Sequence, residues 1–339
     1  MNTIRLIQSA SEIDDTEWDA LAKRSSVTTW FQTKDAYTLY SSVQEFTPFV
    51  FAIENHGLKG VVVGYITKSP QKIKQAFTSR AIIYGGPLID DNITQIELNT
   101  LLTGLIKYIR SKEFVSHPIY IETRNFNSYG KWKEQFNKCG FLYEPHLNFH
   151  IDTTSELDAQ YRIGKHRWKY IRLSIRDGAT LVEKPSIKQI DEFYEILIAL
   201  YKDKVKTPLY SREFFYALNK IDTSHFIFVE FNGHIIGGVV CVGLEGKKLY
   251  EWFACGNDHY QKGIRPSSVA TWFGMQYAAN HGYKIFDLMG AGKPDDKYGV
   301  RDFKQEFGGE LVEHGRFLYI NKPLLYRIGK LGVMLLRKM

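Results

Sequence analysis

The chain has 339 residues, of which 44% are hydrophobic and 24% are charged. This composition excludes an intrinsically disordered protein, and the length predicts two domains of ordinary size. The net charge of +7 favours anionic partners such as phosphates, nucleic acid or anionic lipid, without choosing among them.

The cysteine pattern predicts a protein of a reducing compartment. Cys139, Cys241 and Cys255 lie far apart and form no CxxC pair, so we expect free thiols and a cytoplasmic location. No run of 18 uncharged apolar residues predicts a membrane span, and charged residues near the N-terminus exclude a signal peptide. His146 and His150 are four residues apart without an HExxH motif, so we expect no metal site.

One short pattern occurs twice in the chain. Residues 49–63 read FVFAIENHGLKGVVV, and residues 226–240 read FIFVEFNGHIIGGVV. Both combine a strand of alternating bulky residues, a polar Asn-Gly type of turn and a Val-rich strand, which is typical of a β-hairpin. The sequence after each hairpin also corresponds, in the order helix, strand, short amphipathic segment and strand (94–112, 118–121, 132–140 and 148–152; then 267–281, 284–287, 303–309 and 316–320). The alternation predicts an α/β fold built from two similar halves.

A basic segment lies between the halves. Its cations are spaced by three or four residues over 161–176, which predicts one helix with one basic face (Arg162, Lys165, Lys169, Arg172 and Arg176). Two interpretations stay open, a solvated surface helix and a binding site for a phosphate-bearing substrate.

The second half carries a more specific motif. Phe286-Asp287-Leu288-Met289-Gly290 is followed by Tyr298-Gly299-Val300 and by Phe303-Lys304-Gln305-Glu306-Phe307-Gly308-Gly309. This arrangement resembles the Fem (FemAB-type) aminoacyltransferases, which build peptidoglycan interpeptide bridges, and related acyltransferase domains of polysaccharide gene clusters. The resemblance implies two GNAT-like acyltransferase domains in tandem. Residues 1–157 would form the first, 158–178 a basic interdomain helix, 179–320 the second, and 321–339 a basic amphipathic C-terminal helix.

The resemblance also implies a function. The chain would be a cytoplasmic transferase that moves an acyl or aminoacyl group onto an amine of a nucleotide- or lipid-linked precursor of the cell wall or of a surface glycan. It would hold no tightly bound cofactor, and its donor would be either aminoacyl-tRNA or an acyl-CoA. Two alternatives remain, an acetyl-CoA-dependent N-acetyltransferase of the GNAT type and a non-enzymatic module that binds RNA or phosphate.

Three residues are the candidates for catalysis. The resemblance places Lys304 where the acyl donor and the acceptor meet, and a fixed cation there would stabilise the developing oxyanion. Asp287 ends a predicted strand, where it would accept a proton from the attacking ammonium, orient the substrate or merely cap a turn. Tyr298 lies in a Gly/Pro-rich loop, where it would donate to the oxyanion or line the acceptor site.

Other residues are candidates for substrate binding. By position, Lys204 and Lys206 resemble the segment that holds nucleotide phosphates in the soluble Fem-type enzyme, and Arg265 precedes the long helix of the second half. Tyr250 and Trp252 lie on a predicted strand, where sheet packing is the alternative. Phe303 and the basic-helix residue Arg172 complete the set.

The C-terminal tail predicts a second kind of contact. Leucines and an isoleucine alternate with Arg327, Lys330, Arg337 and Lys338 at helical spacing over 322–339, as in a basic amphipathic helix. Two interpretations stay open, packing onto the domain and reversible contact with the inner membrane surface.

Overall fold

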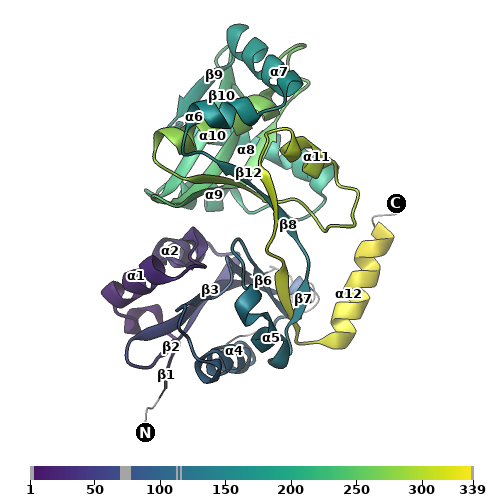
Figure 1. Ribbon diagram of the computed structural model, residues 1–339. Coiled ribbons are helices and arrows are strands. Elements are labelled where there is room, and N and C mark those ends of the chain that lie inside the picture. The colour runs from purple at the N-terminus through teal and green to yellow at the C-terminus, as the bar shows by residue number, and fades with distance from the viewer. Residues whose placement is uncertain (1–3, 69–77, 112–113, 115–116, 337–339) are drawn as a thin grey trace. The chain divides into compact units, whose positions relative to one another are not determined.

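The computed structural model describes residues 4–68, 78–111, 114 and 117–336. Within them the chain forms two compact units, each with its own sheet and hydrophobic core (Figure 1). Unit 1 consists of Met1–Pro145 together with His314–Met339, and unit 2 consists of His146–Glu313. The three cysteines are free thiols. None of the helices in the described part of the chain could span a bilayer.

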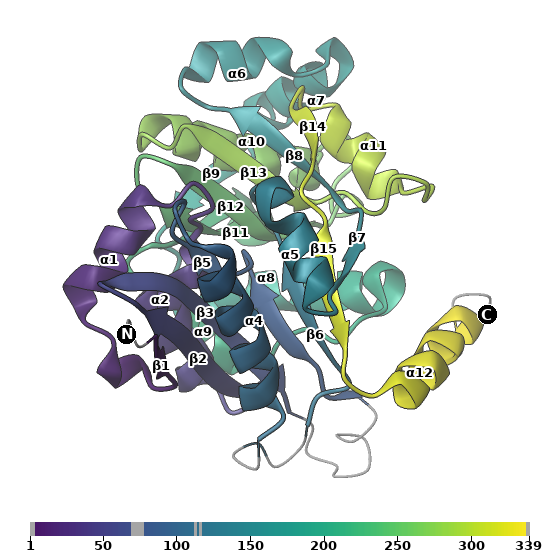
Figure 2. The same cartoon turned by 60° about the horizontal axis from the view of Figure 1, so that its bottom comes forward.

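The sheet of unit 1 has the strand order β1-β2-β3-β4-β6-β15-β7, and β5 pairs with β3 beside this path. Phe49 and Phe51 alternate along β2 and form one core with Leu101 and Leu102 of α4, a helix that crosses the sheet in Figure 2. The elements are β1 (Arg5–Ile7), α1 (Asp15–Arg24), α2 (Lys34–Ser42), β2 (Phe46–Glu54), β3 (Leu58–Thr67), β4 (Ala81–Tyr84), β5 (Leu88–Ile89), α4 (Gln95–Ile109), β6 (Tyr120–Arg124), α5 (Lys133–Lys138), β7 (Leu142–Glu144), β15 (Arg316–Ile320), α12 (Pro323–Leu336) and the 3₁₀ turns Ala10–Glu12, Trp30–Gln32 and Gly130–Trp132.

The sheet of unit 2 has the order β9-β10-β11-β12-β13-β8-β14. Helix α10 packs on β10, β11 and β12 and carries the largest share of the core, while α8 contacts β11 and β12. The elements are β8 (Leu147–Asp152), α6 (Glu156–Arg162), α7 (Lys165–Arg176), β9 (Thr180–Glu183), α8 (Ile187–Leu200), a π-helical turn (Tyr201–Val205), α9 (Arg212–Leu218), β10 (Ser224–Phe231), β11 (His234–Leu244), β12 (Lys248–Gly256), α10 (Pro266–Asn280), β13 (Ile285–Gly290), α11 (Gly299–Gln305) and β14 (Glu310–Glu313).

The two sheets are copies of one arrangement. The predicted hairpins are β2–β3 and β10–β11, and each occupies the second and third positions of its sheet. The next pair of neighbours, β4–β6 in unit 1 and β12–β13 in unit 2, is parallel in both. The predicted α/β fold with two similar halves is therefore confirmed.

The boundaries between the halves differ from the predicted ones, because the closing strands are exchanged. Strand β8, expected to complete the first half, pairs with β13 and β14 of unit 2. Strand β15, expected to complete the second half, pairs with β6 and β7 of unit 1. The chain thus enters unit 2 after Pro145, returns to unit 1 at His314, and does not divide near residues 157 and 179. Equivalent strands have similar patterns, so the sequence could not reveal which sheet each one joins.

The prediction of one helix over 161–176 is also wrong, since α6 ends at Arg162 and α7 begins at Lys165. The Gly308-Gly309 corner lies against this break. A Cβ atom at Gly308 would be 2.2 Å from the carbonyl oxygen of Arg162, and Gly308 has a φ of +75°. The N–H of Gly164 donates to the carbonyl of Glu306 at 2.9 Å. Arg162 therefore lies outside the basic face of α7, and its guanidinium pairs with Asp152.

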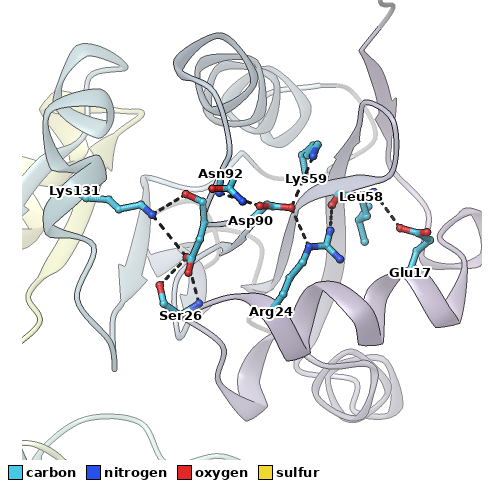
Figure 3. Close-up of polar contacts among 9 residues, drawn as sticks. Glu17, Arg24, Ser26, Leu58, Lys59, Asp90, Asn92 and Lys131 are labelled. Atoms are coloured by element: carbon cyan, nitrogen blue, oxygen red, sulfur yellow. Dashed lines mark hydrogen bonds and ion pairs between the residues drawn. The ribbon is translucent and has the colours of Figure 1, made fainter.

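Polar contacts fix the turn after β5 in unit 1 (Figure 3). The guanidinium of Arg24 on α1 donates to the Asp90 carboxylate at 2.9 Å and to the carbonyl of Leu58 at 2.7 Å. Lys131 donates to the backbone carbonyl of Asp91 at 2.7 Å. Burial would raise the pKa of Asp90, but the Asn92 N–H and Arg24 bring that pKa below its ordinary value. These contacts link α1, β3 and the turn, which is a structural role.

Candidate active site

The second unit contains a place where two neighbouring strands both become irregular. The parallel ladder between β12 and β13 ends at the pair Tyr250 and Asp287. Just beyond it Trp252 is an extra residue in β12, since Glu251 pairs with Cys241 and the next pair joins Val240 to Phe253. Strand β13 also contains an extra residue between Asp287 and Gly290, relative to β8. Such bulges are common beside functional sites because they redirect side chains.

Asp287 organises the end of β13. One oxygen of its fully buried carboxylate is 3.0 Å from Nε2 of His150, and the other accepts the backbone N–H of Met289 at 2.7 Å. The second bond accompanies a φ of +56° at Met289, in the left-handed region. Burial would raise the pKa of Asp287, but His150, Lys248 and the Met289 N–H bring that pKa below its ordinary value. The Asp287 carboxylate is thus ionised, and both of its oxygens already have partners that fix the end of β13. This arrangement does not favour its predicted role as a proton acceptor.

Lys304 reaches this strand end from α11. Its ammonium donates to the carbonyl oxygen of Leu288 at 2.5 Å and to that of Gly290 at 2.9 Å. Burial lowers the pKa of Lys304, while the charges of Glu251 and Asp287 counteract part of that effect. The ammonium is therefore held in a fixed position at the end of the β12–β13 ladder.

Glu251 is the second carboxylate near Lys304. It lies on β12 with 5% of its surface exposed, and Thr271 of α10 donates a hydrogen bond to it. Its Oε2 atom has no hydrogen-bond partner among the described residues. Burial raises the pKa of Glu251 to about 7, against the opposing charge of Lys304. Because Tyr250 pairs with Asp287, strand alternation puts Glu251 on the other face of the sheet from Asp287.

Aromatic contacts anchor the short helix that carries Lys304. Phe307 is fully buried in the core of unit 2, and the ring of Phe303 packs against it with 5.3 Å between centroids. The guanidinium of Arg167 on α7 lies 4.6 Å from the Phe303 ring centroid and donates to Ser268 and to Glu306. Phe303, predicted to bind substrate, thus takes part in the support of α11.

The internal repeat offers a comparison within the same chain. Residues 132–136 correspond to 303–307, so Lys133 is the counterpart of Lys304. Lys133 is exposed, and its ammonium lies 3.6 Å from the centroid of the Tyr143 ring. The two copies of one motif therefore hold their lysines differently, and only the copy in unit 2 places the ammonium on strand-end carbonyls.

The remaining aromatic candidates have different surroundings. Trp252 is half-buried and packs on Tyr210 and Phe214. Tyr250 is completely buried, so it belongs to the core and offers no surface to a substrate, contrary to its predicted role. Tyr298 is 40% exposed just before α11, and its ring lies against Gly292.

The predicted basic residues are exposed at three separate places in unit 2. Lys204 lies in the π-helical turn, and Lys206 follows it with a φ of +54°. Arg265 precedes α10, with its guanidinium 5.7 Å from the ring centroid of Tyr170. Arg172 lies on the exposed face of α7. Among the described residues these cations make no hydrogen bond or ion pair with Lys304, so their role in binding remains a prediction.

Sequence reasoning did not select Glu251, His150, Lys248 or Arg167. For Glu251 a signal existed, because it is a lone acid within the apolar strand LYEWFAC. His150 meets Asp287 only through the exchange of β8, which no local pattern reveals. Lys248 lies on β12, the strand beside β13, and its ammonium is 3.4 Å from Nε2 of His150. Among the described residues, no three His, Cys, Asp or Glu side chains are grouped as a metal site requires.

The sequence around these residues is similar to that of a known protein family. A model of the FemAB family matches residues 231–331, the range that contains Glu251, Asp287 and Lys304. No curated protein matches the chain in sequence.

Several solved structures have a similar fold. The structure of FemX matches with a TM-score of 0.71 and 15% identity, covering 95% of this chain and 99% of its own. L-PGS from Bacillus licheniformis has a TM-score of 0.57 and 13% identity, with coverages of 96% and 97%. A tandem GNAT protein from the clavulanic acid biosynthesis pathway has a TM-score of 0.57 and 8% identity, with coverages of 93% and 98%.

The family match supports a transferase of acyl or aminoacyl groups. The solved structures support the tandem GNAT-like architecture. The chain accordingly resembles the Fem-type family, in sequence over residues 231–331 and in fold over nearly its whole length.

Proposed function

We propose that this protein transfers an aminoacyl group from an ester donor to an amine of a cell-wall or surface-glycan precursor. The observation that carries the proposal is the Lys304 ammonium fixed at the end of the β12–β13 ladder. An ammonium has three N–H donors, and among the described residues two backbone carbonyls engage it. One donor is thus left for the carbonyl oxygen of an acyl group.

The reaction needs positioning and charge stabilisation more than covalent chemistry. The acceptor reacts as a neutral amine: its nitrogen forms a bond to the carbonyl carbon of the donor, and negative charge develops on the carbonyl oxygen. Lys304 stabilises that oxyanion, and a single such donor contributes about 10²–10³ in rate. The carbon–oxygen bond of the ester then breaks, and the departing alkoxide takes up the one proton that the attacking nitrogen loses, which leaves an amide and an alcohol. Asp287 and His150 act indirectly, by holding the strand end on which Lys304 rests.

The start of α10 favours an aminoacyl ester over coenzyme A. Helix N-termini bind phosphates through free N–H groups, but here protein groups already occupy them. The N–H of Ser267 donates to the Asp258 carboxylate at 3.1 Å, the N–H of Arg265 donates to Ser174 at 2.9 Å, and Pro266 has none. A carboxylate at this position would repel a pyrophosphate. Aminoacyl-tRNA is the donor that we propose, and acetyl-CoA is the alternative.

The acceptor is anionic in this proposal. Exposed Arg265, Lys204 and Lys206 in unit 2 would pair with the phosphates of a nucleotide- or lipid-linked precursor. Such precursors carry free amines on their peptide or sugar parts, and they are made in the cytoplasm. The protein would therefore work in the cytoplasm.

A transfer assay with a matched pair of variants tests the proposal. Purified enzyme is given nucleotide-linked muramyl pentapeptide and either total tRNA charged with labelled amino acids or labelled acetyl-CoA. We expect transfer from charged tRNA, and Lys304→Met should reduce kcat by about 10²-fold or more. The counterpart variant Lys133→Met should keep near-normal turnover. Normal turnover of Lys304→Met would contradict the site, and transfer from acetyl-CoA alone would contradict the donor.

A further inference from the structure

Helix α12 is fixed to unit 1 at its beginning. Before it, Lys322 donates to the carbonyl of His117 at 2.7 Å, and Asn321 donates to that of Pro118 at 2.9 Å. Within its first turn, the ring of Tyr326 packs edge-on against Tyr120 of β6, with 5.6 Å between centroids. These contacts fix the beginning of the helix and the direction in which its other faces point.

The side opposite Tyr326 presents apolar residues to solvent. Leu324 is 71% exposed and Ile328 is 50% exposed. They are four residues apart, so they share one face of the helix, whereas Tyr326, midway between them in sequence, lies about half a turn away. We call this surface the Leu324–Ile328 face. Most single exposed apolar residues need no explanation. Two on one face of a helix whose beginning is fixed form an apolar surface that points away from Tyr326.

The sequence of α12 and of the strand before it carries charge of only one sign. From His314 to the last residue the sequence contains no Asp or Glu, while it contains six cations (Arg316, Lys322, Arg327, Lys330, Arg337 and Lys338). Arg327 and Lys330 are exposed on α12 itself. An apolar face on a helix that carries cations and no acids of its own matches the boundary of an anionic bilayer, where acyl chains lie beneath negative headgroups.

We propose that the Leu324–Ile328 face of α12 docks reversibly on an anionic lipid surface. A second copy of the chain suits this face poorly, because an isologous contact would bring cations of both copies together. A nucleic acid would use the cations but would leave the apolar side chains exposed to water. The inference does not depend on the proposed chemistry, since it rests on α12 in unit 1 and not on Lys304.

Vesicle co-sedimentation of the full-length protein tests the proposal. Vesicles of phosphatidylcholine with phosphatidylglycerol should bind the protein at low salt, whereas vesicles of phosphatidylcholine alone should not. The double variant Leu324→Ser/Ile328→Ser should reduce the partition coefficient at least about tenfold, because two apolar side chains no longer enter the lipid. Arg327→Gln should reduce it about fivefold, as expected for one cation near an anionic surface.

A matched control separates docking from general hydrophobicity. Ile96 and Leu142 are 72% and 56% exposed elsewhere in unit 1, so Ile96→Ser/Leu142→Ser should leave vesicle binding unchanged. Equal loss in the control would overturn the assignment to α12, as would absence of binding by the unaltered protein. Concentration-dependent dimerisation that Leu324→Ser/Ile328→Ser abolishes, without vesicle binding, would make a second copy the occupant and would also overturn it. Circular dichroism should show that all variants are folded.

Discussion

At the scale of single residues, one ammonium lies within the electrostatic influence of two buried carboxylates. Asp287 is held as an anion by His150 and the Met289 N–H, whereas Glu251 lacks comparable donors and takes up a proton near neutral pH. The charge of Glu251 raises the pKa of Lys304, which burial lowers. The protonation of Glu251 thus influences whether Lys304 is an ammonium, the form that an oxyanion requires.

Replacing Glu251 should therefore change the pH dependence of transfer. In Glu251→Gln the acid's negative charge is absent, so the pKa of Lys304 should fall further and the alkaline limb of kcat/KM should move to lower pH. A titration near pH 7 that belongs to Glu251 should also disappear from the profile. The other groups around Glu251 are Asp287, Cys241 and Thr271, and the substitution leaves them in place. The profile is measured between pH 6 and 10.

Glu195 provides the control for this experiment, because it is an exposed acid on α8 that pairs with Arg212. Glu195→Gln should keep the profile of the unaltered enzyme. If Glu251→Gln kept that profile as well, the coupling between Glu251 and Lys304 would have no part in the reaction.

Whether the sequence could predict a site residue depends on how far apart in the chain its contact partners lie. Lys304 and Asp287 belong to a continuous motif, so a resemblance could select them. Glu251 acquires its properties from burial beside α11 and α10, and His150 meets Asp287 across 137 positions of sequence. Periodicity describes only the face on which a residue lies, so it could not separate buried Tyr250 from half-buried Trp252.

At the scale of elements, the glycine pair after α11 determines where a helix ends. The corner at Gly308 occupies the space beside the backbone of Arg162, where α6 stops and α7 has not yet begun. The predicted continuous helix over 161–176 agreed with the spacing of the cations. The spacing carries no information on the contact with Gly308, which is distant in sequence. Helices and hairpins with local signals were found correctly, such as α4, where Thr94 and Glu97 form a capping box.

The variant Gly308→Ala should destabilise unit 2. A Cβ atom would collide with the backbone of Arg162, and alanine at a φ of +75° is strained, so we expect a loss of about 2 kcal/mol or more in the free energy of unfolding. Gly299→Ala is the matched control, since a Cβ atom there meets nothing within 4 Å. The free energy of unfolding of that control, measured by urea denaturation, should stay within about 0.5 kcal/mol of the value for the unaltered protein. A Gly308→Ala protein as stable as the control would show that the corner adjusts freely.

At the scale of the whole molecule, each sheet contains one strand from the other half of the sequence. In unit 1 that strand is β15, which lies between β6 and β7. Its Arg316 pairs with buried Glu122 at 2.6 Å. Burial would raise the pKa of Glu122, but Arg124 and Arg316 hold it at about 2. The attachment of β15 is thus both a hydrogen-bonded ladder and an ion pair within the sheet.

Two truncations should distinguish the contribution of β15 from that of α12. A chain ending at Glu313 lacks β15, so β6 and β7 should lose protection against hydrogen exchange, while β10 to β12 of unit 2 should keep theirs. A chain ending at Asn321 keeps β15 and should retain protection in both units. Hydrogen exchange read by mass spectrometry gives the result peptide by peptide. Full protection of β6 in the shorter chain would mean that β15 is dispensable.

The exchanged strands also impose an order on biosynthesis. All strands and helices of unit 2 lie in one uninterrupted stretch, His146–Glu313, whereas unit 1 is interrupted by that stretch. During translation the N-terminal part of unit 1 therefore cannot complete its sheet until the whole of unit 2 has left the ribosome. Until then β6 and β7 lack β15, the strand that lies between them. The part that carries Lys304 can fold first, and the nascent N-terminal part is the one that a chaperone would need to protect from aggregation.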